Sequence, residues 1–124
     1  MIILYALVRC GGKGTHGRII DVILDNQLME HREGDDDIRS NGKRAIVNDL
    51  EFARQDLKDL ALLSMPKHGT WAITDAGRER FVKFARSLSS NRALWEDGIK
   101  KGELRRTGTK FLDAVELLVK EMKL

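Results

Sequence analysis

The residues that could do chemistry in this chain are mostly cations and small polar donors gathered ahead of one predicted helix. They are Arg39, Ser40, Asn41, Lys43 and Arg44. The free amides at a helix N-terminus favour an anion, and cations beside them strengthen that preference for a phosphate. We therefore expect these five residues to contact a phosphate backbone.

The polar face of the same predicted helix supplies a second group of candidates. Asn48 and Gln55 point away from the apolar stripe of the helix, so their amides are suited to the edges of bases. Arg54 lies at the border of the stripe. It either pairs with a carboxylate such as Asp56 or Glu51, or contacts a phosphate.

A predicted turn further along the chain completes the candidate DNA contacts. Lys67 and His68 occupy this turn and are expected to touch a second strand or groove. Trp71, in the strand that follows, either packs beneath the turn or stacks on a base, including a methylated one. We keep Trp71 among the candidate contacts.

Catalytic and metal chemistry is not expected from this sequence. The three histidines fall on different predicted elements without metal-ligand spacing, and Cys10 forms no motif with any of them. The glycines at 11–14 lack the order of a phosphate-binding loop, and the aspartates at 35–37 lack the spacing of a calcium loop. We predict that the protein is not an enzyme and uses no cofactor or metal.

Length and hydropathy favour one soluble domain. The chain has 124 residues, which suits a single compact core. No stretch reaches the roughly 18 apolar residues that a membrane span needs. The apolar run at 1–8 is short and lacks the basic leader of a signal peptide, so we expect a cytoplasmic protein.

The net charge of +3 comes from the C-terminal third of the chain. Residues 1–85 hold 13 basic and 13 acidic side chains, whereas residues 86–124 hold 9 and 6. Because residues 1–85 carry no net charge, they favour either a protein-binding module or DNA binding by a local basic cluster. About four to six phosphate contacts would give a log–log salt slope of roughly −4 to −5.

Hydrophobic periodicity predicts the order helix, helix, helix, hairpin, helix. The third helix carries the strongest signal, with an apolar stripe from Val47 to Ala61. This is the order of a winged helix, a helix-turn-helix variant whose third helix can enter a DNA major groove. The predicted class is mainly α with a small β-hairpin (α+β). The expected elements are helices at 2–8, 15–28, 44–63 and 74–88, strands at 63–65 and 70–73, and an exposed loop at 31–43.

The polar residues 87–91 predict a boundary between a winged-helix domain, 1–86, and a C-terminal helical extension, 87–124. The apolar stripe from Phe111 to Met122 either packs back on the domain or pairs with the same helix of a second copy. We favour a homodimer. Arg105, Arg106 and Lys110 precede this helix and are either further phosphate contacts or an ordinary basic linker.

The stretch from Arg44 to Gly77 carries a recognisable pattern: an arginine-bearing helix, a leucine-rich helix end, a proline-basic-glycine-tryptophan hairpin, and a threonine before a glycine. The residues are Asn48, Ala53, Arg54, Leu57, Leu60, Leu62, Leu63, Pro66, Lys67, Gly69, Trp71, Ile73, Thr74 and Gly77. This pattern resembles the N-terminal winged-helix domain of Mrr-type restriction system proteins. Residues 1–28 are compatible with it.

The resemblance implies a DNA-binding module, which in that family commonly directs a separate nuclease domain to DNA, in many cases modified DNA. The 39 residues after Ala85 are too few for that nuclease, and Glu121 to Lys123 match only the end of its motif. We therefore predict a non-enzymatic double-stranded DNA-binding protein, a reader of DNA or a transcriptional or defence regulator. The alternatives are a protein–protein interaction module and the specificity subunit of a nuclease acting in trans.

Overall fold

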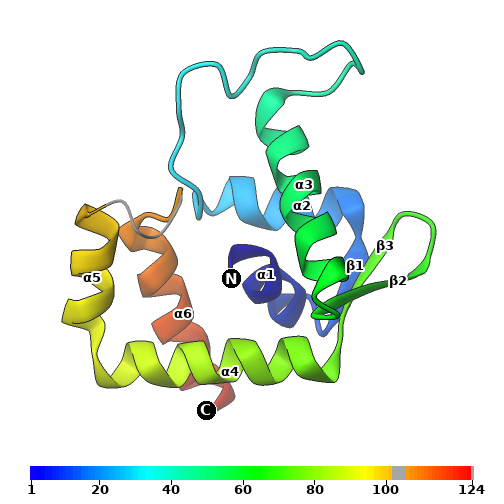
Figure 1. Cartoon of the computed structure of the whole chain (residues 1–124). Helices are drawn as coiled ribbons and strands as arrows, with labels where there is room; N and C mark the ends of the chain where they lie inside the picture. Colours follow the sequence, from blue (N-terminus) through cyan, green and yellow to red (C-terminus); the bar gives the residue numbers. More distant parts are fainter. Residues whose placement is uncertain (102–105, 124) are drawn as a thin grey trace.

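The computed structural model describes residues 1–101 and 106–123. Within them the chain forms six helices and three strands (Figure 1). The elements are α1 (Ile2–Arg9), β1 (Lys13–Thr15), α2 (His16–Asp25), α3 (Ala45–Asp59), β2 (Leu63–Lys67), β3 (Thr70–Ile73), α4 (Asp75–Ser90), α5 (Arg92–Lys100) and α6 (Thr109–Met122).

The three strands form one antiparallel sheet in the order β1, β3, β2. β1 was not predicted, because its residues carry no apolar or β-branched run, and pairing with β3 holds them in the extended conformation. Gly11 and Gly12 have positive φ values of 82° and 107°, which let the chain turn from α1 into this strand. The sheet and the first three helices make a winged-helix-like α+β fold, which confirms the predicted class.

α1 forms the centre of a single hydrophobic core. The six residues from Ile3 to Val8 are all buried, and α1 contacts α2, α3, α4 and α6 (Figure 1). The largest fully buried side chains are Trp71 of β3, Phe81 of α4 and Phe111 of α6. In the described part of the chain, no helix has the length and apolar character needed to cross a membrane.

The C-terminal helices complete this core. Phe111, Leu112 and Val115 are at most 1% exposed, and the rings of Phe111 and Tyr5 of α1 form a T-shaped pair with their centres 5.8 Å apart. The apolar stripe of α6 therefore packs on its own domain, which was one of the two predicted alternatives. The predicted boundary at residue 87 falls inside α4, so no linker separates the helices at that point.

α3 is shorter than predicted. Ala61 has a φ of 60°, in the left-handed region, and the Leu62 amide donates to the Leu57 carbonyl at 2.9 Å, which closes the helix. A glycine is usual at such a position, and because this sequence has an alanine there, the end of the helix could not be predicted from it. Leu60 is 64% exposed, so it and Ala61 do not belong to the buried stripe, contrary to the prediction.

Candidate nucleic-acid interface

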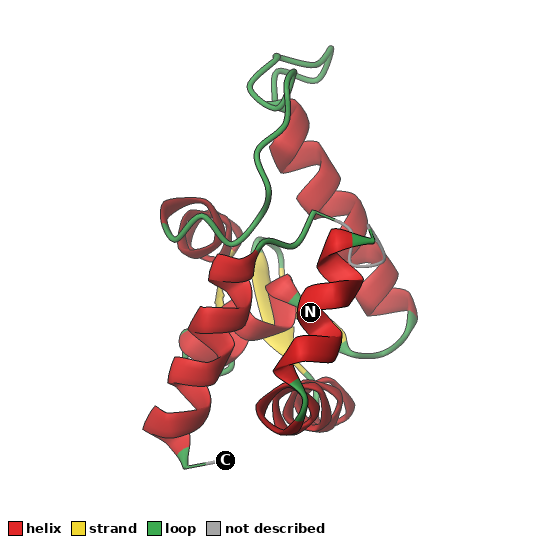
Figure 2. Ribbon diagram, turned by 90° about the vertical axis from the view of Figure 1, so that its left-hand side faces the viewer, coloured by secondary structure: helices red, strands yellow, loops and turns green. Residues whose placement is uncertain are grey.

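The backbone of the loop between α2 and α3 caps the N-terminus of α3. The side chain of the N-cap residue, Arg44, makes no capping hydrogen bond. Instead, the carbonyl oxygens of Asp35 and Asp37 accept hydrogen bonds from the amides of Ile46 (3.0 Å) and Ala45 (2.8 Å). The acidic run at 35–37 thus fixes the start of α3. Figure 2 shows this loop and the start of α3 projecting beyond the other helices.

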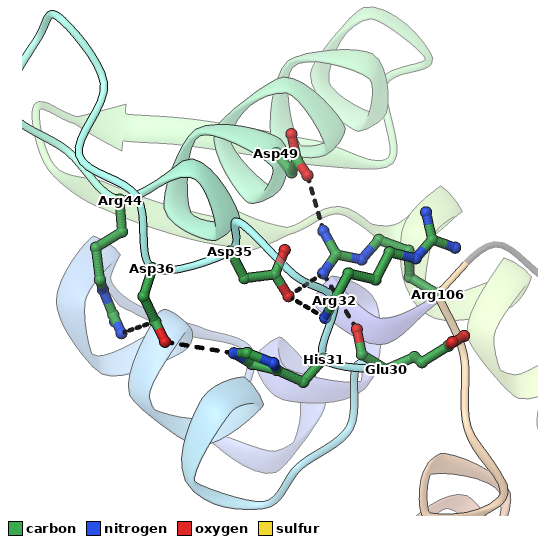
Figure 3. Close-up of polar contacts among 8 residues, drawn as sticks. All are labelled: Glu30, His31, Arg32, Asp35, Asp36, Arg44, Asp49 and Arg106. Atoms are coloured by element: carbon green, nitrogen blue, oxygen red, sulfur yellow. Dashed lines mark hydrogen bonds and ion pairs between the residues drawn. The ribbon is translucent and has the colours of Figure 1, made fainter.

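One residue of this loop is buried, although the loop was predicted to be exposed. Asp35 is 5% exposed, and its Oδ2 accepts from Arg106 Nη2 (2.5 Å) and from the Arg32 amide (2.6 Å). Arg106 also donates to Asp49 on α3 (2.8 Å) and to the Glu30 carbonyl (3.1 Å) (Figure 3). A segment near α6 is therefore tied to the start of α3.

Arg106 lies in the segment between α5 and α6, as the linker alternative expected, but its guanidinium is bonded to Asp35, Asp49 and the Glu30 carbonyl and is not free to contact a phosphate. Its side chain is 10% exposed, and both of its terminal nitrogens donate to groups of the protein. Lys110 donates to Gln27, and Arg105 lies outside the described residues.

The cations predicted to contact phosphates divide into two kinds. Lys43 Nζ lies 2.7 Å from Glu51 Oε1, and Arg44 Nη1 lies 3.2 Å from Asp36 Oδ1, so both are engaged in ion pairs. Arg39 is exposed at the loop tip, and its side chain has no partner within residues 1–101 and 106–123. Ser40 beside it is also exposed.

Asn48 and Gln55 lie two turns apart on one side of α3, as the periodicity predicted. Asn48 Oδ1 accepts from Asn41 Nδ2 at 3.0 Å, and the amino group of this half-buried Asn48 has no partner among residues 1–101 and 106–123. Gln55 Nε2 donates to Asp59 (2.9 Å), and its oxygen accepts from Arg54 (2.9 Å). The loop tip and the helix therefore orient these two amides.

Glu51 lies between these amides, and its role was not predicted. His16 Nε2 lies 2.8 Å from Glu51 Oε1, the same oxygen that accepts from Lys43. Burial alone would raise the pKa of the Glu51 carboxyl, but the hydrogen bonds from Lys43 and His16 outweigh burial, and the pKa lies below its ordinary value. The sequence signal that could have revealed this role is the spacing, because Glu51 follows Asn48 by three residues and both side chains then lie on the same side of a helix.

The hairpin turn is fixed beside the start of α2. The His16 amide donates to the Gly69 carbonyl at 2.9 Å. Lys67 and His68, which precede this glycine, are exposed, as a contact role requires. β1 and the first turn of α2 add two exposed cations that the sequence did not suggest as contacts, Lys13 and Arg18.

Trp71 belongs to the core and must be removed from the candidate contacts. Its side chain is 1% exposed, and its ring meets the His16 ring edge-on at 5.3 Å. A side chain this deeply buried cannot stack on a base. The alternative in which it packs beneath the hairpin is correct.

Arg54 joins α3 to the hairpin. Its guanidinium lies 5.8 Å from the centre of the Trp71 ring, and Nη1 donates to Met65 Sδ of β2 at 3.3 Å. Neither predicted carboxylate, Glu51 or Asp56, is its partner in the described part of the chain.

Across residues 1–101 and 106–123, no group of three or more His, Cys, Asp or Glu side chains could hold a metal ion.

Three helices, an antiparallel sheet and a hairpin beside the third helix define a winged-helix-like domain. The sequence matches a family model described as the Mrr N-terminal domain over residues 2–83. Because the match spans more than half of the chain, this protein belongs to that family, as its residue pattern indicated. The match ends inside α4, and α5 and α6 follow it. No match was found among curated proteins or among solved structures.

Proposed function

We propose that this protein binds double-stranded DNA without catalysing a reaction, with α3 in the major groove and the hairpin turn against a neighbouring strand. One observation carries the proposal. His16 contacts α3 through its ring and the hairpin turn through its backbone amide, so the polar helix face and the basic turn are held side by side. This is the arrangement with which a winged helix meets a duplex.

The proposed contacts have different tasks. Phosphates are bound at the loop tip and the hairpin turn, and base edges by the amides of α3. Arg54 and the Lys43 and Arg44 ion pairs hold the interface in shape. The phosphate group is Arg39, Ser40, Asn41, Lys67 and His68, and the base-edge group is Asn48 and Gln55. Membership in the Mrr N-terminal domain family supports a role as a reader of plain or modified DNA in restriction or defence.

The salt dependence of binding tests the phosphate contacts. Arg39→Ala combined with Lys67→Ala removes two exposed cations that make no ion pair within the described residues. The slope of log K against log salt is expected to become less steep by about 1.8, since each contact contributes about 0.9. The measurement is fluorescence anisotropy with a labelled duplex of about 20 base pairs over a range of salt concentrations.

Lys100→Ala with Lys120→Ala is the matched control, because it removes the same charge from exposed positions of α5 and α6. This variant should keep the wild-type slope. An unchanged slope for the Arg39 and Lys67 variant would remove these residues from the interface. Failure of the wild type to bind any duplex at low salt would overturn DNA binding altogether.

A protein partner is the second candidate function, and exposed apolar side chains on α3 favour it. Phe52 is 73% exposed and lines a groove of about 490 Å³ whose other walls include Ile3, Leu50 and Leu57. Such a surface suits an apolar anchor of another protein, including a nuclease subunit acting in trans.

Phe52→Ser tests whether that ring is needed for folding. Because the ring is exposed, the free energy of unfolding should change by less than about 0.5 kcal/mol, measured by urea denaturation. A loss above about 1 kcal/mol would mean that the ring packs within the chain, and the argument for a docking surface would fail.

Homodimer formation remains a prediction. Most of the apolar stripe that it relied on is buried within the chain, so pairing through α6 would have to use the large apolar side chains left exposed there. These are Leu117, at 52%, and Met122, at 43%. Sedimentation equilibrium over a range of concentrations would give the oligomeric state.

A further inference from the structure

We infer that Glu51 is a specificity residue of the proposed DNA interface, and that its carboxylate accepts a hydrogen bond from the exocyclic amino group of a cytosine in the major groove. The inference rests on the proposed function. It goes further by naming the base and the side chain that recognises it.

The position of Glu51 on α3 suits base contact. It follows Asn48 by three residues and precedes Gln55 by four, so the three side chains lie along one side of the helix. The Glu51 side chain is 21% exposed. It therefore reaches the surface within the row of amides that the proposal places against base edges.

The hydrogen bonds of Glu51 leave one acceptor available. Lys43 and His16 both contact Oε1. Oε2 has no partner among residues 1–101 and 106–123. An ionised carboxylate only accepts hydrogen bonds, and the base donors in the major groove are the amino groups of cytosine and adenine. Adenine places its N7 acceptor next to that donor, which a carboxylate opposes, so cytosine is the better match.

A carboxylate near DNA needs compensation, because phosphates repel it. The Lys43 ammonium at 2.7 Å supplies a full positive charge, and the His16 ring contacts the same oxygen at 2.8 Å. The lowered pKa of Glu51 agrees with an ionised group at neutral pH. Both contacts also hold the carboxylate in one orientation before DNA arrives, which lowers the entropic cost of recognition.

A purely structural role for Glu51 makes a different prediction. In that case Glu51 would only tie the loop and α2 to α3. A glutamine at this position keeps an oxygen that accepts from both Lys43 and His16. Glu51→Gln therefore preserves the tie while removing the carboxylate, so a change in base preference reports on the carboxylate alone.

The experiment is selection of bound duplexes from a randomised DNA library by the full chain. Wild type, Glu51→Gln and Asp56→Asn are compared. Asp56→Asn is the matched control, since it removes one negative charge from an exposed position of the same helix, on the side that lines the groove beside Phe52. Duplexes differing only at the selected position are then titrated by anisotropy.

The wild type should select a cytosine at one position and bind about tenfold more weakly when that C·G pair becomes T·A. Asp56→Asn should select the same site. Glu51→Gln should lose the preference for cytosine, because its oxygen is occupied by Lys43 and His16 and its amino group can only donate, as the cytosine amino group does.

Two results would overturn the inference while leaving DNA binding intact. One is a wild type that binds duplexes without selecting a cytosine at any position. The other is a Glu51→Gln variant that selects the wild-type site unchanged. A wild type that binds no duplex would instead overturn the proposed function, so the two failures are distinguishable.

Discussion

Replacing Gly77 with alanine is expected to destabilise the protein by about 3 kcal/mol. A Cβ atom at this position would lie 2.0 Å from the backbone carbonyl oxygen of Leu62, so the backbone itself must move. Hydrogen bonds of Thr74 join the start of α4 to the end of α3, because Thr74 Oγ1 accepts from the Gly77 amide (3.0 Å) and donates to the Ala61 carbonyl (2.7 Å). Separating α4 from the end of α3 disrupts all of these contacts together.

Urea denaturation of Gly77→Ala and Gly17→Ala provides a matched comparison. Gly17 also lies in the first turn of a helix, but a Cβ there meets nothing within 4 Å. Gly17→Ala is expected to stabilise the protein by roughly 0.5–1 kcal/mol, because alanine loses less backbone entropy on folding. Equal unfolding midpoints for the two variants would show that the close approach at Gly77 does not limit stability.

Local patterns were sufficient for the elements that surround Gly77. A helix was predicted to begin at Thr74, and Thr74 caps α4 with its side chain, which accepts from the Gly77 amide. Strong periodicity located α3, and the turn at Gly69 located the hairpin. These features depend on residues a few positions apart, and a sequence displays such relations directly.

Features that depend on distant partners were not predicted. β1 exists because Gly14 pairs with Trp71 of β3, 57 residues further along the chain, and a Lys-Gly-Thr segment with one β-branched residue gives no sign of it. The loop at 31–43 looked too polar to be fixed. Asp35 in this loop is held by Arg106, which lies 71 residues further along the chain. Composition describes a segment's tendency to be buried but not which distant charge it meets.

The same difference between local patterns and distant contacts applies to the candidate interface. Periodicity correctly placed Asn48 and Gln55 on the polar side of α3. The predicted turn correctly indicated that Lys67 and His68 are exposed. The sequence could not tell that Trp71 is buried, because an aromatic residue beside a turn suits either a core or a base. Nor could it show that Lys43 meets Glu51, since an isolated cation in a loop looks the same with or without a partner.

Replacing Arg106 with methionine is expected to cost about 3 kcal/mol at neutral pH, because it leaves Asp35 buried without its charge partner. Both side chains are at most 10% exposed, so water cannot replace the lost contact. The start of α3 depends on this loop, and we expect the variant to weaken DNA binding as well. Lys101→Met breaks an exposed pair with Asp97 and should cost less than about 0.5 kcal/mol.

The pH dependence of stability checks the origin of this effect. Burial alone would raise the pKa of Asp35, but the Arg32 amide and Arg106 outweigh burial, and the pKa is lowered. An acid with a lowered pKa stabilises the fold above its unfolded value, about 4, and this stability is lost as the pH falls through the folded pKa. Asp35→Asn does not titrate, so its deficit relative to wild type should be largest at neutral pH and shrink below about pH 4.

Urea denaturation of wild type, Arg106→Met, Asp35→Asn and the double variant at several pH values separates the ion pair from simple packing. The double variant should lose less stability than the sum of the single variants, because neither change then leaves a buried charge alone. If Arg106→Met costs no more than Lys101→Met, the pair does not hold the loop. If instead the deficit of Asp35→Asn stays constant from neutral to acidic pH, the stabilisation comes from packing and not from charge.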